Sequence, residues 1–377
     1  MGIYWIISLT LTFFAIVEVV LSNNENSKWI RLYIYIVAVG VLFTFGGIRG
    51  LGTGLDDFQY RDFYSQFASK ITIKGFWESL KDFRYEPAIY FIALISRVFS
   101  KNADIFIFIY CMIAVCVNSF YFKKLSPLPM VALAVYSAHL FINKDMNQIR
   151  FGLSSAFLLG FVYHTCNKNK KGMVKLFILS FISHATAITA LLIPLSLIVK
   201  RNKFIPIAIV LVSIPMAFIG SSAIISLVSS HIGSIGERAM GYANQDSAQE
   251  QGILTLSNLK NIGFVFIFSF MLLNNSLKKI APEKFNFYYV IVITFAIGSG
   301  LRLALQDYAS GGRLANYLLQ VEPVLISLCI YESFKLKKVA AVSVTILMVL
   351  YYLYYNTISS KQSVVGYEVA QSYQLLK

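Results

Sequence analysis

Residues 103–122, ADIFIFIYCMIAVCVNSFYF, decide the class of fold. The stretch has a single charged side chain, Asp104 near its start, and almost everything after it is apolar. An α-helix needs about 20 such residues to cross the hydrocarbon core of a bilayer. A helix that is apolar around its whole circumference belongs in lipid or at the centre of a bundle. This stretch therefore predicts a transmembrane helix.

The same pattern recurs along the whole chain. Of its 377 residues, 57% are hydrophobic and 14% are charged, and the mean hydropathy is +0.66. A soluble domain has about 25% charged residues, and a membrane β-barrel has short alternating segments instead of long apolar runs. The sequence predicts an all-α, polytopic transmembrane helical bundle of about 10–12 spans, with half-helices among them. The expected spans are residues 3–21, 29–48, 88–99, 103–122, 128–142, 148–165, 173–199, 204–229, 259–277, 285–300, 314–331 and 339–355.

Lysine and arginine lie mainly in the short connections between these runs. The net charge of +15 therefore reflects basic cytoplasmic loops, and it does not indicate a nucleic-acid partner. Placing Lys28 and Arg31 in the cytoplasm makes the loops 50–85 and 230–258 external. We expect one membrane domain over residues 1–358, followed by a C-terminal tail over residues 359–377.

One run, residues 173–199, is too long for a single crossing. As one helix it would measure about 40 Å, whereas the hydrocarbon core is about 30 Å thick. Basic residues flank both of its ends, and Ser-His-Ala-Thr, residues 183–186, lies near its middle. Two half-helices that enter and leave on one side would hold His184 in a cavity at membrane depth. One of the short runs, 88–99 or 128–142, would then also fail to cross.

Residues 46–64, GGIRGLGTGLDDFQYRDFY, open the largest external loop and combine Arg49 with three glycines at alternate positions. Such a backbone turns tightly and can approach a ligand closely. Asp56 and Tyr60, one helical turn apart, follow directly. An arginine beside carboxylates offers both a phosphate clamp and an acid or base, and the alternative is a solvated loop. Aromatic residues farther along the loop predict an amphipathic segment on the membrane surface.

Two polar motifs stand where apolar helices are expected to begin. Pro87 at a first helical position places Glu86 at the N-cap, and capping by itself would explain this carboxylate. Asn147, Gln148 and Arg150 open another span. Charges at the border of the hydrocarbon layer are costly, so Arg150 is a candidate for function. The alternative is an arginine that extends to the lipid head groups.

A third polar motif begins at Arg313. Arg313, Asn316, Tyr317 and Gln320 are spaced so that they share one face of a helix. Polar groups on a membrane helix should face a cavity or a partner helix, and a structural hydrogen-bond network is the alternative reading. Arg302, near the end of the preceding span, is a weaker candidate of the same kind.

These residues together predict a site for an anionic lipid-linked substrate. Arginine side chains match phosphate oxygens with two parallel hydrogen bonds, and a neutral His184 can accept a proton near neutral pH; a lone buried histidine is the alternative. The four cysteines lie in or beside apolar runs without a CxxC pair, and no second histidine stands at metal-ligand spacing. We therefore expect no disulfide framework, no metal and no cofactor. We expect a phosphate or pyrophosphate carried on a lipid.

The ordered set of motifs resembles the Wzy-type O-antigen polymerases and the related EpsG-type exopolysaccharide proteins of bacteria. The resemblance covers about residues 1–335. The motifs that carry it, in order, are Arg49 with Gly54-x-Asp56 and Tyr60, Glu86-Pro87, Asn-Gln-Ile-Arg at 147–150, His184, and Arg313 with Tyr317. It implies a fold like that of the membrane-embedded GT-C-type glycosyltransferases.

The resemblance also implies an activity and roles for the residues. The protein would be a metal-independent glycosyltransferase of the bacterial inner membrane that joins oligosaccharide repeat units on undecaprenyl pyrophosphate, with its site toward the periplasm. Arg150 and Arg313 would hold the departing pyrophosphate, and Arg49 would serve the lipid pyrophosphate of either substrate. The proton would go to His184, Asp56 or Glu86. The remaining candidates for substrate binding are Asn147, Gln148, Tyr60, Tyr317 and Arg302. A chain-length regulator is left open as a protein partner.

Three other functions compete with this one. A flippase or transporter for lipid-linked oligosaccharide would use the same cationic cavity without a base. An O-acetyltransferase would need a cytoplasmic path for an acyl donor, which the sequence does not indicate. A purely structural partner would leave the polar stripes on two membrane helices without a purpose.

Overall fold

The computed structural model describes most of the chain as helices. The described residues are 2–69, 77–78, 85–199, 201–219, 254–274, 281–306, 311–334, 337–359 and 366–374. The predicted loop 230–258 and the centre of loop 50–85 fall largely outside them. The chain forms two compact units: unit 1 is Met1–Gly160, Lys175–Ala185 and Ile326–Lys377, and unit 2 is Phe161–Val174 and Thr186–Leu325. Each unit is described by itself.

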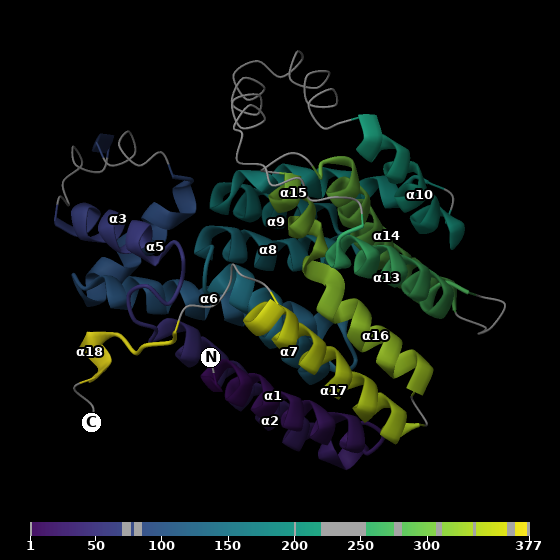
Figure 1. Ribbon diagram of the computed structural model, residues 1–377, viewed down its shortest axis with the longest axis horizontal. Helices are drawn as coiled ribbons and strands as arrows, with labels where there is room; N and C mark the ends of the chain where they lie inside the picture. The colour runs from purple at the N-terminus through teal and green to yellow at the C-terminus, as the bar shows by residue number, and fades with distance from the viewer. Residues whose placement is uncertain are drawn as a thin grey trace. The chain divides into compact units, whose positions relative to one another are not determined.

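Unit 1 is built on long apolar helices that pack side by side. Helix α1 contacts α2, α7 and α17, and α2 also packs along α6 (Figure 1). Helix α6 begins where the Asn102 side chain accepts a hydrogen bond from the Asp104 amide, which satisfies a free N–H of its first turn. The bounds are α1 Gly2–Leu21, α2 Lys28–Gly47, α6 Ala103–Leu125, α7 Pro129–Ala138 and α17 Lys338–Tyr354.

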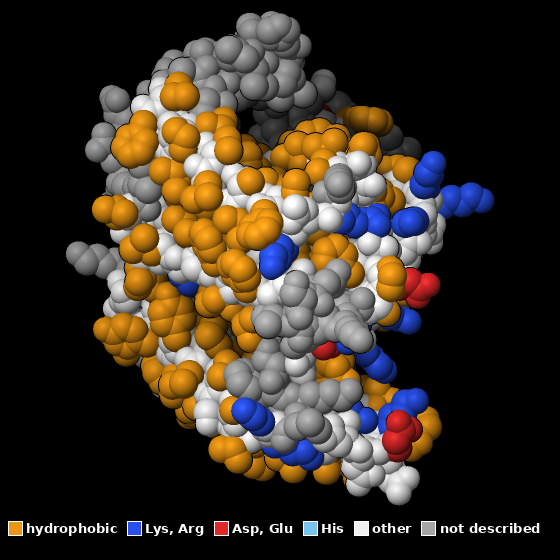
Figure 2. Space-filling model, turned by 90° about the vertical axis from the view of Figure 1, so that its right-hand side faces the viewer, with side chains coloured by type: hydrophobic (Ala, Val, Ile, Leu, Met, Phe, Trp, Pro, Cys, Tyr) orange, Lys and Arg blue, Asp and Glu red, His pale blue; other side chains and the backbone are white. Residues whose placement is uncertain are grey.

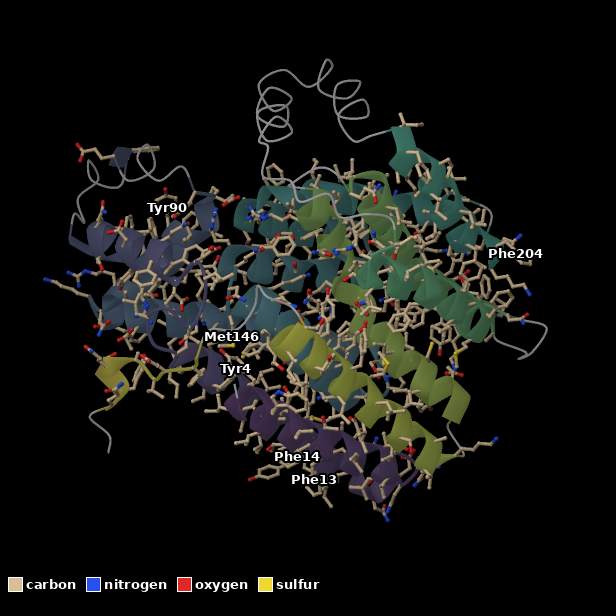
Figure 3. The ribbon with its side chains drawn as sticks, viewed as in Figure 1. Tyr4, Phe13, Phe14, Tyr90, Met146 and Phe204 are labelled. Atoms are coloured by element: carbon tan, nitrogen blue, oxygen red, sulfur yellow. The ribbon has the colours of Figure 1, made fainter. Side chains whose placement is uncertain are left out.

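Two shorter helices of unit 1, α3 (Asp57–Ser69) and α5 (Pro87–Phe99), pack on α6 through aromatic rings. Phe63 of α3 meets Tyr90 of α5 edge-on at 5.3 Å, and Tyr90 is marked in Figure 3. Both side chains are buried among other aromatic residues. The start of loop 50–85 is therefore a folded helix that buries Phe63 in protein, while Phe58 on the same helix is 61% exposed. Contact of this segment with the membrane surface stays a prediction, because helical spacing reveals an apolar face but not what covers it.

Unit 2 is organised around α14 (Pro282–Ala304). This helix packs against α10 (Phe204–Ile219), α13 (Leu256–Leu272) and α15 (Gly311–Leu318). A short 3-10 turn, Leu319–Val321, follows α15 and leads into α16 (Glu322–Phe334). Most residues of α14 are buried, as expected for the central helix of a bundle.

Two predicted spans are broken. The run 173–199 consists of α9 (Lys170–Ser183) and a 3-10 helix, Ala185–Leu197, and His184 lies at the break. This confirms the predicted interruption at His184, while entry and exit on one side stay a prediction. Helix α7 likewise ends at Ala138 and is followed by a π-helical turn, Phe141–Asp145, a geometry that often marks functional sites.

The helices have the composition of a multi-pass membrane protein. Within the described residues, 6 helices are long and apolar enough to cross a membrane. Helices α5 and α7, with 13 and 10 residues, are both shorter than these six, so which of the two runs fails to cross stays a prediction. Figure 2 shows hydrophobic side chains spread over much of one face of the molecule. On α1, Phe13 points away from the bundle with 60% of its surface exposed (Figure 3), as a lipid-facing residue should.

Candidate functional site

Arg150 and Glu86 form an ion pair in unit 1. Glu86 occupies the N-cap position before α5, but its side chain makes no capping hydrogen bond. It instead accepts a hydrogen bond from Arg150 Nη1, on the first turn of α8 (Ile149–Cys166). The two side chains are 20% and 21% exposed. Glu86 therefore stands at the N-cap position that the sequence predicted. Its carboxylate, however, binds Arg150, 64 positions away, instead of capping the helix.

Two tyrosine rings cover the guanidinium of Arg150. Its central carbon lies 4.3 Å from the centre of the Tyr85 ring and 5.9 Å from that of Tyr60. Cation–π contacts of this kind hold an arginine in one orientation. The pKa of Tyr60 is raised to about 12, mainly by burial; the charge of Arg150 lowers it and the charge of Asp56 raises it. The Tyr60 hydroxyl thus stays protonated at neutral pH and is available as a hydrogen-bond donor, and Asp56 is close enough to influence it.

His184 lies beside this pair. Its ring meets Phe151, the neighbour of Arg150, edge-on at 5.5 Å. The amide of Ala185 donates a hydrogen bond to Glu86 Oε1 at 3.3 Å. Glu86 therefore connects the start of α5, the start of α8 and the break after α9. Five of the predicted residues, Asp56, Tyr60, Glu86, Arg150 and His184, gather here, and we call them the Arg150 cluster.

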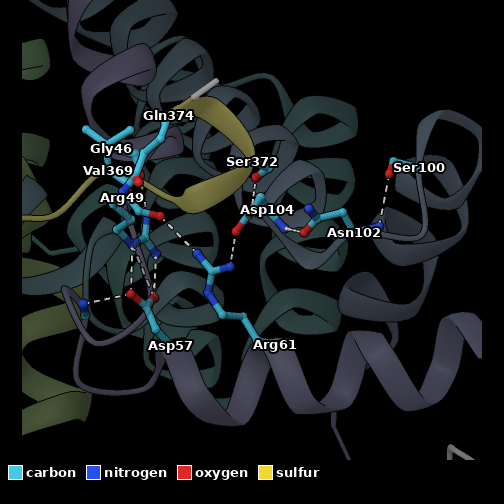
Figure 4. A network of polar contacts seen from close by, with 11 residues as sticks. Gly46, Arg49, Asp57, Arg61, Ser100, Asn102, Asp104, Val369, Ser372 and Gln374 are labelled. Carbon is cyan, nitrogen blue, oxygen red and sulfur yellow. Dashed lines mark hydrogen bonds and ion pairs between the residues drawn. The ribbon is translucent and has the colours of Figure 1, made fainter. Parts of the chain in front are cut away.

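Arg49 is fully buried and engaged by protein groups. Its Nε and Nη2 atoms donate to Asp57 Oδ1 at 3.2 and 3.1 Å, and Nη1 donates to the carbonyl of Gly46 at 2.6 Å (Figure 4). Burial lowers the pKa of Arg49, but the Asp57 carboxylate, together with the nearby Cys111 and Tyr4 side chains, outweighs this effect and raises the pKa above its ordinary value. In this arrangement Arg49 anchors the loop at the start of α3. Binding of a lipid pyrophosphate by Arg49 stays a prediction.

Asn147 ties the glycine-rich loop to the segment before α8. Its Oδ1 accepts from the Leu55 amide at 3.0 Å, and its Nδ2 donates to the carbonyl of Ile142 at 2.9 Å. Both functions of the amide are used within the protein. Gln148, next in sequence, is half-buried, and its backbone N–H donates to the Lys144 carbonyl at 2.6 Å. Asn147 thus holds the loop that precedes Tyr60.

Gly54 of this loop lies directly against the segment before α8. A Cβ atom at this position would lie 2.1 Å from the carbonyl oxygen of Met146, whose position is marked in Figure 3, and 2.8 Å from Asp57 Oδ1. We expect Gly54→Ala to displace the loop, to lower the thermal midpoint of the detergent-purified protein, and to cost roughly 1–3 kcal/mol of stability. Gly40→Ala is the matched control, because a Cβ there has nothing within 4 Å. Equal midpoints for the two variants would contradict this close approach.

The remaining predicted residues belong to unit 2. Arg302 donates from Nε to Asn258 Oδ1 at 3.0 Å and from Nη1 to Asn316 Oδ1 at 2.8 Å, so part of the predicted stripe on α15 serves a hydrogen-bond network. Tyr317 is buried, and the Arg313 side chain is exposed. Of these residues, Arg302 and Asn316 are in contact within unit 2. Their meeting with the Arg150 cluster stays a prediction.

Three buried charged residues were missed as site candidates. Asp57, not its neighbour Asp56, is the partner of Arg49. Lys144 and Asp145, at the π-helical turn, are 4% and 1% exposed, and Asp145 Oδ2 accepts from the Tyr136 hydroxyl at 2.7 Å. Two adjacent charges directly after the apolar run 128–142 were a usable signal, because charge at that depth is rare unless it is paired.

The arrangement offers an anion-binding cation beside proton acceptors. Arg150 Nε is buried without a hydrogen-bond partner, so the guanidinium has donor capacity that Glu86 does not use. Among the described residues, no three side chains of histidine, cysteine, aspartate or glutamate gather as metal ligands would. Arginine, carboxylate, imidazole and tyrosine hydroxyl together can bind a phosphate group and accept a proton.

Comparison with known proteins gives the family. The family model described as EpsG matches residues 31–374, which include the whole Arg150 cluster and the C-terminal segment. The chain belongs to the EpsG family. It is also 33% identical over 381 residues to the amylovoran biosynthesis protein AmsC of Erwinia amylovora, with 100% of both chains covered. No solved structure matches the chain. Membership of the EpsG family confirms the resemblance that the ordered motifs indicated.

Proposed function

We propose that this chain is an exopolysaccharide polymerase of the bacterial inner membrane. It would join oligosaccharide repeat units carried on undecaprenyl pyrophosphate, with its site facing the external side. The observation that carries the proposal is the Arg150 cluster, in which an arginine with spare donor capacity lies against a carboxylate and beside a histidine. Family membership and the relative named for amylovoran biosynthesis support the pathway.

Arg150 would bind the pyrophosphate of the donor lipid. Its guanidinium can offset the negative charge that grows on the leaving group, and the tyrosine rings keep it oriented for this task. Phosphate oxygens would compete with Glu86 for the same N–H groups. Substrate binding would thus release the Glu86 carboxylate from its ion pair at the moment when a proton acceptor is needed.

The chemical step would be a displacement at the anomeric carbon. A hydroxyl at the non-reducing end of the new lipid-linked unit forms the glycosidic bond, the bond from the anomeric carbon to the pyrophosphate oxygen breaks, and undecaprenyl pyrophosphate leaves with both electrons. The hydroxyl proton passes to Glu86, His184 or Asp56. This glycosyltransferase uses arginine instead of a metal ion to offset charge, and a single displacement inverts the anomeric configuration.

We also propose a substrate-binding role for Arg313. Arg313 is the predicted residue with an exposed side chain in unit 2, so it is the one placed to reach a ligand without breaking an internal bond. Arg302 would act through its contacts with Asn258 and Asn316 and so shape the helix that carries Arg313. Tyr317, one turn after Arg313, is buried and stays a candidate for substrate binding.

Deletion of the gene gives the first test. We expect long glycan chains to disappear while a single repeat unit remains on its lipid, because units are still made and delivered but are no longer joined. The measurement is the size profile of lipid-linked and exported glycan. Repeat units trapped on the cytoplasmic face would favour a flippase instead.

Single variants in the same strain distinguish a polymerase from a flippase. A polymerase needs a proton acceptor, so at least one of His184→Ala, Asp56→Asn and Glu86→Gln should reduce chain growth by about 100-fold or more, as general bases contribute factors of about 10²–10⁴. A flippase would tolerate all three. Glu86→Gln is the sharpest of these, because the amide oxygen can still accept from Ala185 while the negative charge is gone.

A further inference from the structure

The C-terminal segment, residues 366–374, returns to the Arg49 loop and pairs with it. The Gly50 amide donates to the Glu368 carbonyl at 2.6 Å, and the Ala370 amide donates to the Ile48 carbonyl at 2.9 Å. These two bonds flank an antiparallel bridge between Arg49 and Val369 (Figure 4). The backbone on both sides of Arg49 is therefore held by the other end of the chain.

Side chains reinforce this pairing. The ring of Tyr367 stacks on Phe45 with centres 4.6 Å apart, and its hydroxyl donates to the Phe45 carbonyl at 2.7 Å. Farther along, Ser372 donates to Asp104, the same carboxylate that accepts from Arg61 of α3. The segment thus contacts the end of α2, the Arg49 loop and the start of α6.

The contacts lead step by step to the Arg150 cluster. The segment holds the peptides around Arg49, and Arg49 holds Asp57 at the start of α3. Tyr60 lies one turn into that helix and covers Arg150. Arg61 of α3 adds a second link between this helix and the Arg49 loop, because its Nη2 donates to the Arg49 carbonyl at 2.9 Å. A shift of the C-terminal segment would therefore move Tyr60 relative to Arg150.

The pairing also indicates on which side of the membrane residues 366–374 lie. Helix α2 ends at Gly47, immediately before the paired residues, and the segment follows α17. The other ends of these helices carry Lys28 and Lys338, and the Lys338 amine donates to the Val20 carbonyl at the end of α1. Basic residues at those ends indicate the cytoplasmic side, so the paired ends are external.

We propose that residues 366–374 are an external strap that positions the Arg49 loop and, through it, Tyr60 over Arg150. Its role in activity rests on the proposed function, whereas its pairing and its side of the membrane do not. The match to the EpsG family extends to residue 374, the last described residue of the strap. The strap residues are positioning residues, since they contact the loop and not the Arg150 cluster.

Disulfide cross-linking tests the pairing without reference to activity. A Cβ atom at Gly50 would lie 3.3 Å from the Cβ of Glu368, close to the spacing of about 3.5–4.5 Å in disulfides. In a full-length chain whose four native cysteines are replaced, we expect the Gly50→Cys, Glu368→Cys pair to cross-link under mild oxidation in intact membranes. The pair Asn23→Cys, Glu368→Cys is the control, because Asn23 follows the far end of α1. Failure of the first pair to cross-link in a variant that still makes polymer would overturn the strap.

Glycan size profiles test the positioning role. We expect a chain ended after Val365, and the variant Ala370→Pro, which lacks the donor to Ile48, to make at least tenfold less long-chain glycan at unchanged membrane abundance. Glu368→Ala should behave as wild type, because its side chain is exposed and its carbonyl remains.

Tyr367→Ala should make less polymer at unchanged membrane abundance. Formation of the Gly50–Glu368 disulfide in this variant should restore polymer. A segment that only stabilised the protein would not give this recovery when abundance is constant. Normal polymer from the shortened chain would refute the positioning role. If the cross-link forms but Arg150→Ala leaves the glycan profile unchanged, the proposed function is refuted and the pairing of the strap is not.

Discussion

Arg150→Ala is expected to abolish long-chain glycan while leaving the protein in the membrane. The loss of one donor group to a developing oxyanion costs about 10²–10³ in rate, and the growing chain requires many successive transfers. The loss of stability should be smaller than for the fully buried Arg49–Asp57 pair, because the Arg150 and Glu86 side chains are 20% and 21% exposed. Water can therefore solvate the carboxylate that is left behind.

Arg150→Lys refines this prediction. Lysine keeps the positive charge but lacks the planar fork that binds two phosphate oxygens and stacks on Tyr85. We expect it to restore only a small part of the polymer. Arg97→Ala is the matched control, since this arginine on α5 donates to the Ala68 carbonyl outside the Arg150 cluster. Full-length glycan from Arg150→Ala at normal yield would rule out Arg150 as the pyrophosphate ligand.

Arg49→Ala is expected to have the largest effect on folding. Arg49 and Asp57 are both 0% exposed, and removing one member of a buried ion pair leaves an uncompensated charge at a cost of about 3–5 kcal/mol. The Gly46 carbonyl also loses its donor. Membrane abundance and the thermal midpoint in detergent should both fall sharply. Abundance equal to wild type would show that the pair is not the anchor described above.

A double variant then separates stability from chemistry. Arg49→Met with Asp57→Leu replaces the pair by apolar side chains of similar size, a change that is often neutral or stabilising. We expect abundance to recover. Polymer should recover with it when Arg49 acts only as an anchor, and should stay absent when Arg49 also binds a lipid pyrophosphate. The comparison of abundance with glycan profile therefore decides the role that the sequence assigned to Arg49.

The sequence by itself determined the class of the protein and the limits of most helices. The run predicted over residues 103–122 is α6, Ala103–Leu125, and the run over 3–21 is α1, Gly2–Leu21. Excess length and a polar centre also predicted the break at His184. These features are local: hydropathy, length and helix-breaking residues act within about one span of the chain.

Only the tertiary structure decided which polar groups meet. It paired Arg49 with Asp57, placed the Glu86 carboxylate on Arg150 instead of in its expected capping role, and brought residues 366–374 back to the Arg49 loop. Helical spacing lists the groups that share a face, but any of several partners on other helices could satisfy them. Which one does so depends on how whole helices pack, because a buried charge is stable only where packing places its partner.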